Sequence, residues 1–450
     1  MLIKARYVLP ISAPSIENGA VVVHDDMIVA VGPAAELCPA YPDEDVYDYG
    51  LAALTPGFVD THTHLEYTAL RGLVEDVPYA QWKSELMAHE AIFSARDWED
   101  SARLGALEAL ASGITTLADI TQTGASGRAA QEMGLRGIIY REVEGMERPL
   151  LKGIMQKALA DIADWEDRFD PVRLEAGLSP HSPYSCHPEL FEAVRDAAVD
   201  GRPVAMHLAG SREEYQFVKY GSSMLGFDVR EQYDAQAPLW LPTGVSPVRY
   251  VDQYRIFCVP RFMAIHCTQV DEEDIDILAR NQVSIAHCPR CNAKLGMGTA
   301  PVDKFLEAGL VVGLGTDSPA ATNTMGMFAE MSNGLLIQRS HSTRTRRRFF
   351  SAHQYLRFAT LDGARALGMD KHIGSLEPGK LADLLVVDLT HSAQVPTREP
   401  ESALVHTSHR SDIILVMVGG RVLYANGDWT EQDGSAIKER VEAIRDKLRA

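Results

Sequence analysis

The pattern of apolar and polar positions changes twice along the chain. Residues 1 to about 55 hold short apolar runs such as Ala20 to Val23, separated by turn residues at Asn18-Gly19 and Asp25-Asp26, as is typical of a small β unit. From residue 56 to 370, strand-like apolar runs alternate with segments whose apolar residues recur at helical spacing, which indicates parallel β/α units. From residue 371 to 450, short strands and turns return, and a final helix follows.

Eight strand-like runs in the central region predict an α/β fold, a (β/α)8 TIM barrel. The strands are expected at residues 57–60, 115–120, 137–143, 173–178, 203–208, 263–267, 283–287 and 310–315. Both terminal regions are expected to pair into one small β-sandwich. The predicted domains are therefore the N-terminal part of the sandwich (1–55), the barrel (56–370), and the C-terminal part of the sandwich with the final helix (371–450).

Composition excludes several classes of function. A formal net charge of −19 argues against nucleic-acid binding, which depends on Lys and Arg, and the basic run Arg344 to Arg348 is too short to change that expectation. No apolar run reaches the ~18 residues of a membrane span, and the N-terminus lacks the layout of a signal peptide, so we expect a cytoplasmic protein without membrane contact. Six cysteines do not form a disulfide framework, and the unaccompanied pair Cys288 and Cys291 is interpreted as structural.

Histidines gather where the predicted strands end. Residues two apart on a strand point to the same side, so His62 and His64 can face one point. Two such histidines alone are equally compatible with a strand end that faces solvent. The later strands, however, end in further ligand-type residues, which are His181, His207, His266, His287 and Asp317. Because the carboxyl ends of barrel strands meet at one mouth, the sequence predicts a metal site there.

Imidazoles and a carboxylate suit Zn²⁺ or Fe²⁺ and leave a coordination position for water. Such a metal lowers the pKa of its water towards ~7, and Asp317 can accept the water's proton. A divalent ion is therefore expected, zinc first and Fe²⁺ as the alternative.

The chain resembles the amidohydrolase superfamily along almost its whole length. The motifs that carry this resemblance are HTH at 62–64, SPHSPYSC at 179–186, MHL at 206–208, IHCTQVD at 265–271, AHCPRCNAKLGMGTAP at 286–301, LGTDS at 314–318 and GSLEPGKLADL at 374–384. Within the superfamily it is similar to the branch of purine-type deaminases and triazine chlorohydrolases. The deaminases of methylthioadenosine, adenosylhomocysteine and aminodeoxyfutalosine are suggested by YREVEG at 140–145, REEYQFVKYG at 212–221 and GVSPVRYVD at 244–252.

The resemblance implies a role for each matching residue. The metal ligands would be His62, His64, His207 and Asp317, with His266 touching the metal or hydrogen-bonding its water. Asp317 and His266 would then be the catalytic residues. The absence of a lysine on the fourth strand implies one metal rather than two, and the family suggests a homodimer or larger homo-oligomer.

The resemblance also implies three substrate-binding residues. His181 would reach the ring or ribose of a heterocyclic substrate, Trp82 would pack on it, and Glu90 would meet the ribose hydroxyls. For Trp82 the alternative is an ordinary core aromatic, and for Glu90 it is a solvated helix residue. The loop from Tyr233 to Pro247 is expected to shape the pocket.

The pattern breaks after the fifth strand. Relatives read His-Leu-x-Glu there, with a glutamate that moves a proton to the ring nitrogen, whereas this chain has Gly210. Another residue, such as Glu213 or Glu214, supplies the proton, or the bond that is hydrolysed needs only Asp317, or the chain has lost activity.

The leading hypothesis is a metal-dependent hydrolase that deaminates an aminated purine nucleoside such as aminodeoxyfutalosine, adenosine or a thio-adenosine. The alternatives are hydrolysis of another C–N or C–Cl bond on a triazine- or pyrimidine-like ring, and a metal-holding binding protein.

Overall fold

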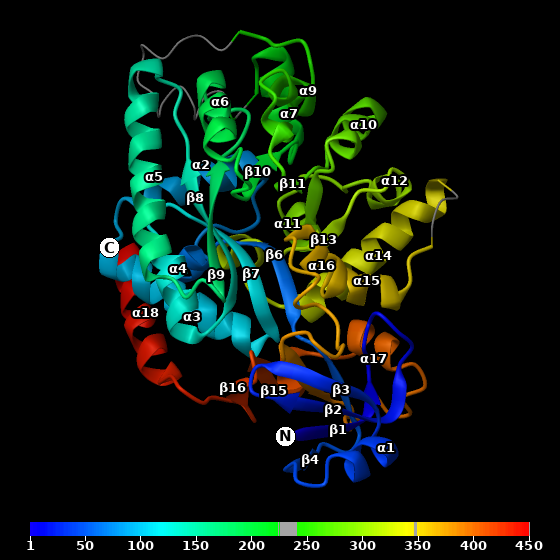
Figure 1. The fold of residues 1–450 in the computed structure, drawn as a ribbon. Helices are drawn as coiled ribbons and strands as arrows, with labels where there is room; N and C mark the ends of the chain where they lie inside the picture. The colour runs from blue at the N-terminus through cyan, green and yellow to red at the C-terminus, as the bar shows by residue number, and fades with distance from the viewer. Residues whose placement is uncertain (224, 226–240, 346–348, 450) are drawn as a thin grey trace.

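A nearly closed parallel barrel forms the centre of the molecule (Figure 1). The computed structural model describes residues 1–223, 225, 241–345 and 349–449. Two stretches singled out from the sequence, Tyr233 to Pro247 and Arg344 to Arg348, lie partly outside the described residues. The eight barrel strands are β6 (Phe58–Thr63), β7 (Ile114–Thr121), β8 (Arg136–Val143), β9 (Leu174–Pro180), β10 (Val204–Leu208), β11 (Phe262–His266), β12 (Ser284–His287) and β13 (Val312–Leu314).

Neighbouring barrel strands pair in parallel and in chain order, from β6 through to β13. A bridge between Thr63 and Asp317 joins the first strand to the segment that follows the last one. All eight strands expected from the sequence are present, and the predicted (β/α)8 barrel is confirmed.

Helices surround the barrel (Figure 1). The helices of this region are α2 (Tyr79–Glu90), α3 (Ala95–Ala111), α4 (Ala125–Met133), α5 (Leu151–Arg168), α6 (Pro188–Ala197), α7 (Arg212–Tyr220), α9 (Pro247–Asp252), α10 (Glu272–Arg280), α11 (Pro289–Lys294), α12 (Val302–Glu307), α13 (Pro319–Thr322), α14 (Met327–Thr345), α15 (Ala352–Phe358) and α16 (Leu361–Ala366). Short 3-10 turns lie at η1 (Leu65–Leu70), η2 (Arg148–Leu150) and η3 (Ile256–Cys258).

Local sequence sets where several helices begin. Ser94 and Asp97 form a reciprocal capping box at the start of α3, and Asp271 and Asp274 form another at α10. At α7 the Ser211 side chain accepts a hydrogen bond from the Glu214 N–H, and the helix ends at Gly221 in a left-handed conformation. These caps satisfy backbone N–H groups that a helix start leaves without partners.

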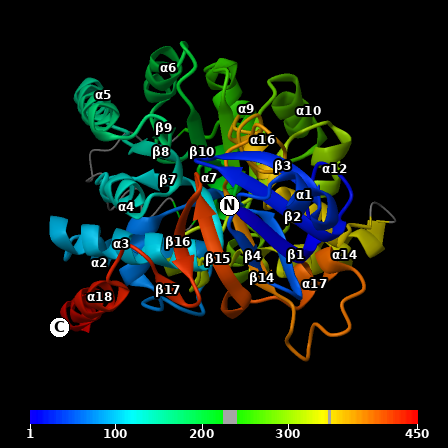
Figure 2. The ribbon, with the colours of Figure 1, turned by 60° about the horizontal axis from the view of Figure 1, so that its bottom comes forward.

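The two terminal regions join in one sheet below the barrel, which Figure 2 turns towards the viewer. Its strands are β1 (Leu2–Val8), β2 (Ile16–His24), β3 (Met27–Pro33), β4 (Val46–Asp48), β5 (Ala52–Pro56), β14 (Leu384–Asp388), β15 (Ile413–Val418), β16 (Arg421–Ala425) and β17 (Asp428–Trp429). β5 links the halves, because it runs parallel to β1 and antiparallel to β14.

The nine strands form one continuous hydrogen-bonded sheet rather than two separate sheets. Apolar side chains from both halves, including Ile3, Val21, Leu54, Val386 and Met417, bury themselves in one shared cluster. The expected pairing of the terminal regions is therefore present, and the sheet encloses its own core.

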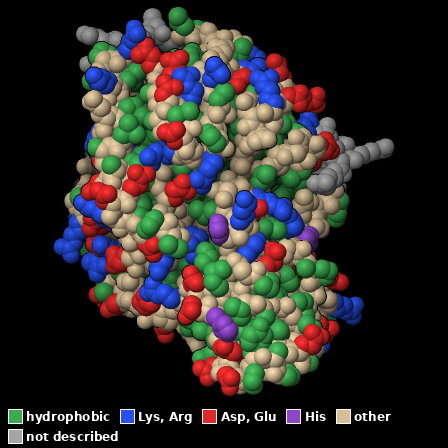
Figure 3. Space-filling model, viewed as in Figure 1, with side chains coloured by type: hydrophobic (Ala, Val, Ile, Leu, Met, Phe, Trp, Pro, Cys, Tyr) green, Lys and Arg blue, Asp and Glu red, His purple; other side chains and the backbone are tan. Residues whose placement is uncertain are grey.

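The remaining elements are α1 (Ala34–Ala40), α17 (Pro400–His406), η4 (Arg410–Asp412) and α18 (Gly434–Arg449). α18 lies beside α3 (Figure 2). It buries Ile437, Val441 and Ile444, and Arg440 pairs with Asp100 of α3 at 2.8 Å between Nε and Oδ1. Within the described ranges, no helix is both long and apolar enough to cross a membrane. On the face seen in Figure 3, acidic and basic side chains are interspersed.

Candidate metal centre and active site

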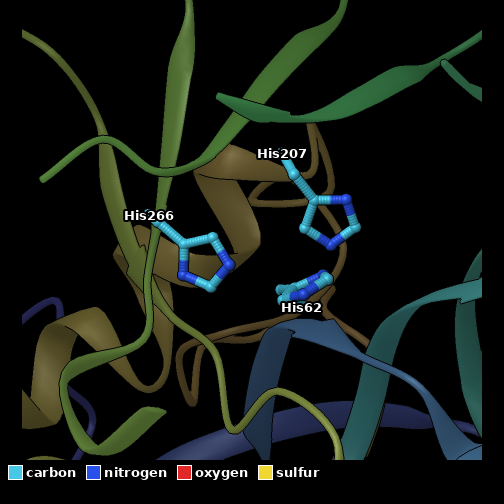
Figure 4. Close-up of side chains that lie close together, drawn as sticks. All are labelled: His62, His207 and His266. Carbon is cyan, nitrogen blue, oxygen red and sulfur yellow. The ribbon is translucent and has the colours of Figure 1, made fainter. Parts of the chain in front are cut away.

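Five side chains converge at one end of the barrel. The ring nitrogens of His62, His207 and His266 lie within 4.8 Å of one another, and ligand atoms of His62, His64 and Asp317 do the same. Figure 4 shows three of the rings, His62, His207 and His266, turned towards a common point from β6, β10 and β11. The structure therefore brings together all five residues that the sequence predicts as ligands.

Hydrogen bonds fix the orientation of three of these rings. Nδ1 of His64 lies 3.1 Å from the Ile120 carbonyl oxygen, and Nδ1 of His207 lies 3.0 Å from the His181 carbonyl oxygen. Nδ1 of His266 lies 2.9 Å from Oδ1 of Asn292. Because these oxygens accept, Nδ1 carries the proton and Nε2 keeps its lone pair, the arrangement found around metal-binding histidines.

Burial keeps these imidazoles neutral. It lowers the pKa of His62 and of His207 well below the usual value and lowers that of His64 to about 4, with neighbouring imidazoles adding to the effect at His62 and His207. Nε2 of His62 is buried and has no hydrogen-bond partner among the described residues. A divalent cation would satisfy this atom, so the donor set fits a metal ion.

Asp317 lies between two of the histidines. Its carboxylate oxygens are 3.7 Å from Nε2 of His62 and 3.7 Å from Nε2 of His266. The Asp317 N–H donates to the His62 carbonyl at 2.9 Å, and the Thr63 hydroxyl donates to the Asp317 carbonyl at 3.2 Å. These bonds hold a left-handed backbone, with φ of 60°, that places the carboxylate against the rings.

The pocket above this centre contains the three predicted substrate-binding residues. The residues that line it are His64, Tyr67, Tyr79, Trp82, Lys83, Leu86, Glu90, Glu142, His181, His207, His266, Cys291, Leu295, Asp317 and Ser318. Trp82 stacks against Tyr79 with ring centroids 6.4 Å apart. Burial raises the pKa of Glu90, whose carboxyl also hydrogen-bonds Tyr67. Trp82 and Glu90 thus belong to the pocket wall, and their roles towards a substrate remain predictions.

His181 makes two polar contacts at the pocket. Nδ1 lies 2.6 Å from the Ser185 hydroxyl, and Nε2 lies 3.1 Å from Nζ of Lys83. Since Lys83 can only donate, Nε2 of His181 accepts and the ring is neutral. Burial lowers the pKa of His181 well below its usual value, and the charge of Lys83 adds to the effect.

Sequence reasoning missed two charged residues of this pocket. Lys83 follows Trp82 on α2, and nothing in the helix pattern sets it apart. Glu142 carried a signal, because it is the last but one residue of β8 and lies two positions after Tyr140, which faces the inner apolar cluster. The strand-end argument that found the histidines applies equally to Glu142.

His287 also ends a predicted strand, yet it does not line the pocket. Its neighbours Ala286 and Cys288 pack in the inner cluster, so strand alternation turns the imidazole the other way. Cys288 and Cys291, interpreted from sequence as structural, are buried free thiols, and Cys291 lines the pocket.

Position 210 faces the metal centre without a side chain. A Cβ built on Gly210 would lie 3.2 Å from Cδ2 of His266 and 3.1 Å from Cε of Met297. Glu214 does not fill this position, since its carboxylate accepts the N–H groups of Ala209 and Gly210 at 2.9 and 2.8 Å. Both oxygens of Glu214 are thus engaged by the backbone, which makes it a poor candidate for the missing acid.

A model of the amidohydrolase family matches residues 53–423. The chain belongs to the amidohydrolase family. A further model, an imidazolonepropionase-like composite domain of bacteria, matches residues 19–43. A 5-methylthioadenosine/S-adenosylhomocysteine deaminase of Moorella thermoacetica is 33% identical over 444 residues, which cover 98% of this chain and 98% of the relative.

Two solved structures extend the comparison. An adenosine deaminase from Xanthomonas campestris with bound zinc superposes with a TM-score of 0.86 and 27% identity, over 100% of this chain and 98% of that one. An atrazine chlorohydrolase from Arthrobacter aurescens, complexed with zinc, shares the fold with a TM-score of 0.83 and 23% identity, over 98% and 99%. The predicted family and the predicted enzyme class, a hydrolytic deaminase, are confirmed, and this amidohydrolase has a site for a divalent metal ion.

Adding Zn²⁺ to the chelator-treated amidohydrolase is expected to raise its thermal midpoint. At a zinc concentration of 100 times the dissociation constant, binding stabilises the native state by ~2.7 kcal/mol, a shift of several degrees. The shift should disappear in His62→Ala and persist in His391→Ala, whose imidazole lies outside the site and is 57% exposed. Differential scanning calorimetry measures it, and an equal shift in both variants would contradict the site.

Proposed function

We propose that this amidohydrolase hydrolytically deaminates an adenine-type nucleoside, such as 5-methylthioadenosine, adenosylhomocysteine, adenosine or aminodeoxyfutalosine, with one zinc ion as cofactor. The observation that carries the proposal is the convergence of four imidazoles and Asp317 at the mouth of the barrel, in a chain whose full-length relatives are named as deaminases of such nucleosides. Fe²⁺ is the alternative metal, because the same donors suit it.

The pocket suits a neutral nucleoside. Aromatic rings of Tyr67, Tyr79 and Trp82 supply apolar surface for a flat base. Glu90 offers a carboxylate to which sugar hydroxyls can donate. Among the described lining residues Lys83 is the one Lys or Arg, and it lies near Glu90 and Glu142. A phosphate group on the sugar would lie against the carboxylate of Glu90, so nucleotides are expected to be poor substrates.

The residues of the centre divide the chemistry between them. A divalent metal held by His62, His64, His207 and Asp317 would supply an activated water at neutral pH. Asp317 takes a proton from the attacking water and passes it to the departing amine. His266 donates from Nδ1 to Asn292, which leaves Nε2 to accept a hydrogen bond from the oxygen that adds.

Ammonia release is the direct test. The zinc- and iron-loaded protein is incubated separately with adenosine, 5-methylthioadenosine, adenosylhomocysteine, aminodeoxyfutalosine and AMP. We expect metal-dependent ammonia release from at least one nucleoside and much less from AMP. No release from any nucleoside, with metal content verified, would contradict the proposal.

One observation favours a second candidate. Gly210 leaves the fifth-strand side of the pocket without an acid, and hydrolysis of another C–N or C–Cl bond on a triazine- or pyrimidine-like ring would need Asp317 alone. Chloride or amine release from a chlorotriazine panel tests it. A metal-holding binding protein is the third possibility, and it predicts ligand binding without any product.

A further inference from the structure

Hydrolysis at a ring carbon of a purine requires a proton on the adjacent ring nitrogen, because otherwise negative charge builds up there as oxygen adds. A positioned acid that supplies this proton typically contributes ~10²- to 10⁴-fold. Gly210 offers no such group, and the carboxylate of Glu214 is taken up by two backbone N–H groups. The acid must therefore come from another wall of the pocket.

Glu142 is a carboxyl group of the pocket that keeps one buried oxygen without a hydrogen-bond partner among the described residues. It lies near the end of β8, is 6% exposed, and lines the pocket. Its Oε2 accepts a hydrogen bond from Nε2 of Gln122 at 2.9 Å, which fixes the carboxyl plane. Its Oε1 is buried and has no hydrogen-bond partner in the part of the chain that the structure describes. An unpaired buried oxygen of this kind is costly unless a ligand uses it.

A carboxylate oxygen of Glu142 also lies close to the reacting centre. Ligand atoms of Glu142, His181 and His207 are within 4.8 Å of one another. These three do not make a second metal site, because the ring nitrogens of His181 already contact Ser185 and Lys83. His207 uses Nδ1 on the His181 carbonyl, so its one remaining nitrogen belongs to the group with His62 and His266. Glu142 is thus left facing the space that a substrate would occupy.

Burial favours the protonated form of Glu142. Burial raises the pKa of Glu142 to about 7, Glu144 adds to the rise, and Lys83 opposes it. A carboxyl group whose pKa is raised in this way is suited to hold a proton and to give it to a substrate.

We propose that Glu142 is the general acid of this enzyme, and that the substrate ring turns the nitrogen beside its reacting carbon towards β8 instead of towards position 210. This inference rests on the proposed deaminase function. It makes Glu142 a catalytic residue that the sequence comparison with relatives, centred on the fifth strand, does not reveal.

The proton balance closes with two carboxyl groups. The Glu142 carboxyl gives its proton to the ring nitrogen while water adds its oxygen to the carbon and gives one proton to Asp317. Asp317 passes that proton to the amino group, and the C–N bond breaks with its electron pair leaving on ammonia. The added oxygen releases its remaining proton to Glu142 as the C=O bond forms. Water and the amine thus become carbonyl and ammonia, and both carboxyl groups return to their starting states.

The first test compares three variants in ammonia release. Glu142→Gln should lower kcat by ~10²- to 10⁴-fold, since the amide cannot transfer a proton. Glu175→Gln is the matched control, because it removes a carboxylate from the opposite end of the barrel, where Glu175 pairs with Arg261, and should leave kcat unchanged. The double variant Gly210→Glu/Glu142→Gln should stay as slow as Glu142→Gln, because a glutamate at 210 starts beside His266 and not on the β8 side towards which the ring nitrogen turns. Recovery of activity would show that the nitrogen faces position 210 and would overturn the proposal. A zinc-dependent thermal midpoint equal to that of the wild type shows that Glu142→Gln is folded and holds the metal.

The second test uses the metal-free protein and does not depend on turnover. Calorimetry compares the binding of adenosine with that of 1-deazaadenosine, which has CH in place of the ring nitrogen. The wild type should bind adenosine about tenfold more tightly than 1-deazaadenosine, the difference in dissociation constant expected for the loss of one hydrogen bond. Glu142→Ala should lose this preference, whereas Glu142→Gln should keep it, because its amide N–H still donates.

The other possible results contradict either the role of Glu142 or the proposed deaminase function. If the wild type is active and Glu142→Gln stays within about threefold of it, far below the effect of a general acid, the assignment of Glu142 is wrong and the deaminase function stands. The same holds if metal-free Glu142→Ala keeps the preference for adenosine. If neither the wild type nor Gly210→Glu releases ammonia from any nucleoside, the proposed function falls and the inference falls with it.

Discussion

Replacing Asp317 with Asn is expected to lower kcat for ammonia release by ~10²- to 10⁴-fold, the typical contribution of a positioned proton-transfer group. The asparagine side chain keeps the size and one carbonyl oxygen of aspartate but cannot carry a proton between water and amine. The hydrogen bond from the backbone N–H of residue 317 to the His62 carbonyl does not involve the side chain and should keep the backbone in place. The asparagine oxygen would then stay where an aspartate oxygen lies now, 3.7 Å from Nε2 of His62 or of His266. The loss should therefore fall mainly on kcat rather than on KM.

The measurement is steady-state kinetics together with the metal content of each variant. Asp252→Asn is the matched control, since Asp252 pairs with Arg280 on the surface. A kcat near that of the wild type in Asp317→Asn would show that Asp317 does not transfer the proton. Loss of metal together with activity would instead show that its main contribution is to hold the ion, and titration with excess zinc separates the two effects.

The barrel and its metal centre were predictable because both follow from alternation and strand direction. Parallel barrel strands are apolar runs whose C-terminal ends all lie at one face of the barrel. The residues that follow these strands therefore come together there, whatever the length and sequence of the connecting loops. This places His207, His266 and Asp317 correctly without any knowledge of the connecting helices. The same rule failed at His287, where the packing of Ala286 and Cys288 in the inner cluster shows the side chain to be on the other face.

Other parts of the site depend on packing that one sequence does not display. Lys83 reaches His181 because α2 lies over the barrel mouth, and the spacing of 98 residues between them gives no sign of it. Glu214 was one candidate for the missing acid. The structure shows that its carboxylate accepts hydrogen bonds from the backbone N–H groups of Ala209 and Gly210. The turn after β10 creates this contact, and no sequence motif indicates it.

A buried ion pair joins the barrel to the terminal sheet, and removing Arg136 is expected to cost ~3–5 kcal/mol of unfolding free energy. Arg136 begins β8, and its Nε and Nη2 donate to the Asp383 carboxylate at 2.8 and 3.3 Å, while Nη1 donates to the Val172 carbonyl. The two side chains are only 6% and 2% exposed. In Arg136→Ala the Asp383 carboxylate would stay buried. Among the described residues, the backbone N–H of Gly419 would be its remaining hydrogen-bond donor.

Urea denaturation measures the loss, and Arg280→Ala provides the comparison. Arg280 also makes a 2.8 Å bond to an aspartate, but its side chain is 62% exposed, so its removal should cost ~0–1 kcal/mol. The double variant Arg136→Met/Asp383→Leu should recover most of the stability, because it removes both charges and leaves no unpaired carboxylate in the interior. Equal losses in Arg136→Ala and Arg280→Ala would show that burial does not set the strength of this contact, and that the two sheets are held together by their apolar surfaces alone.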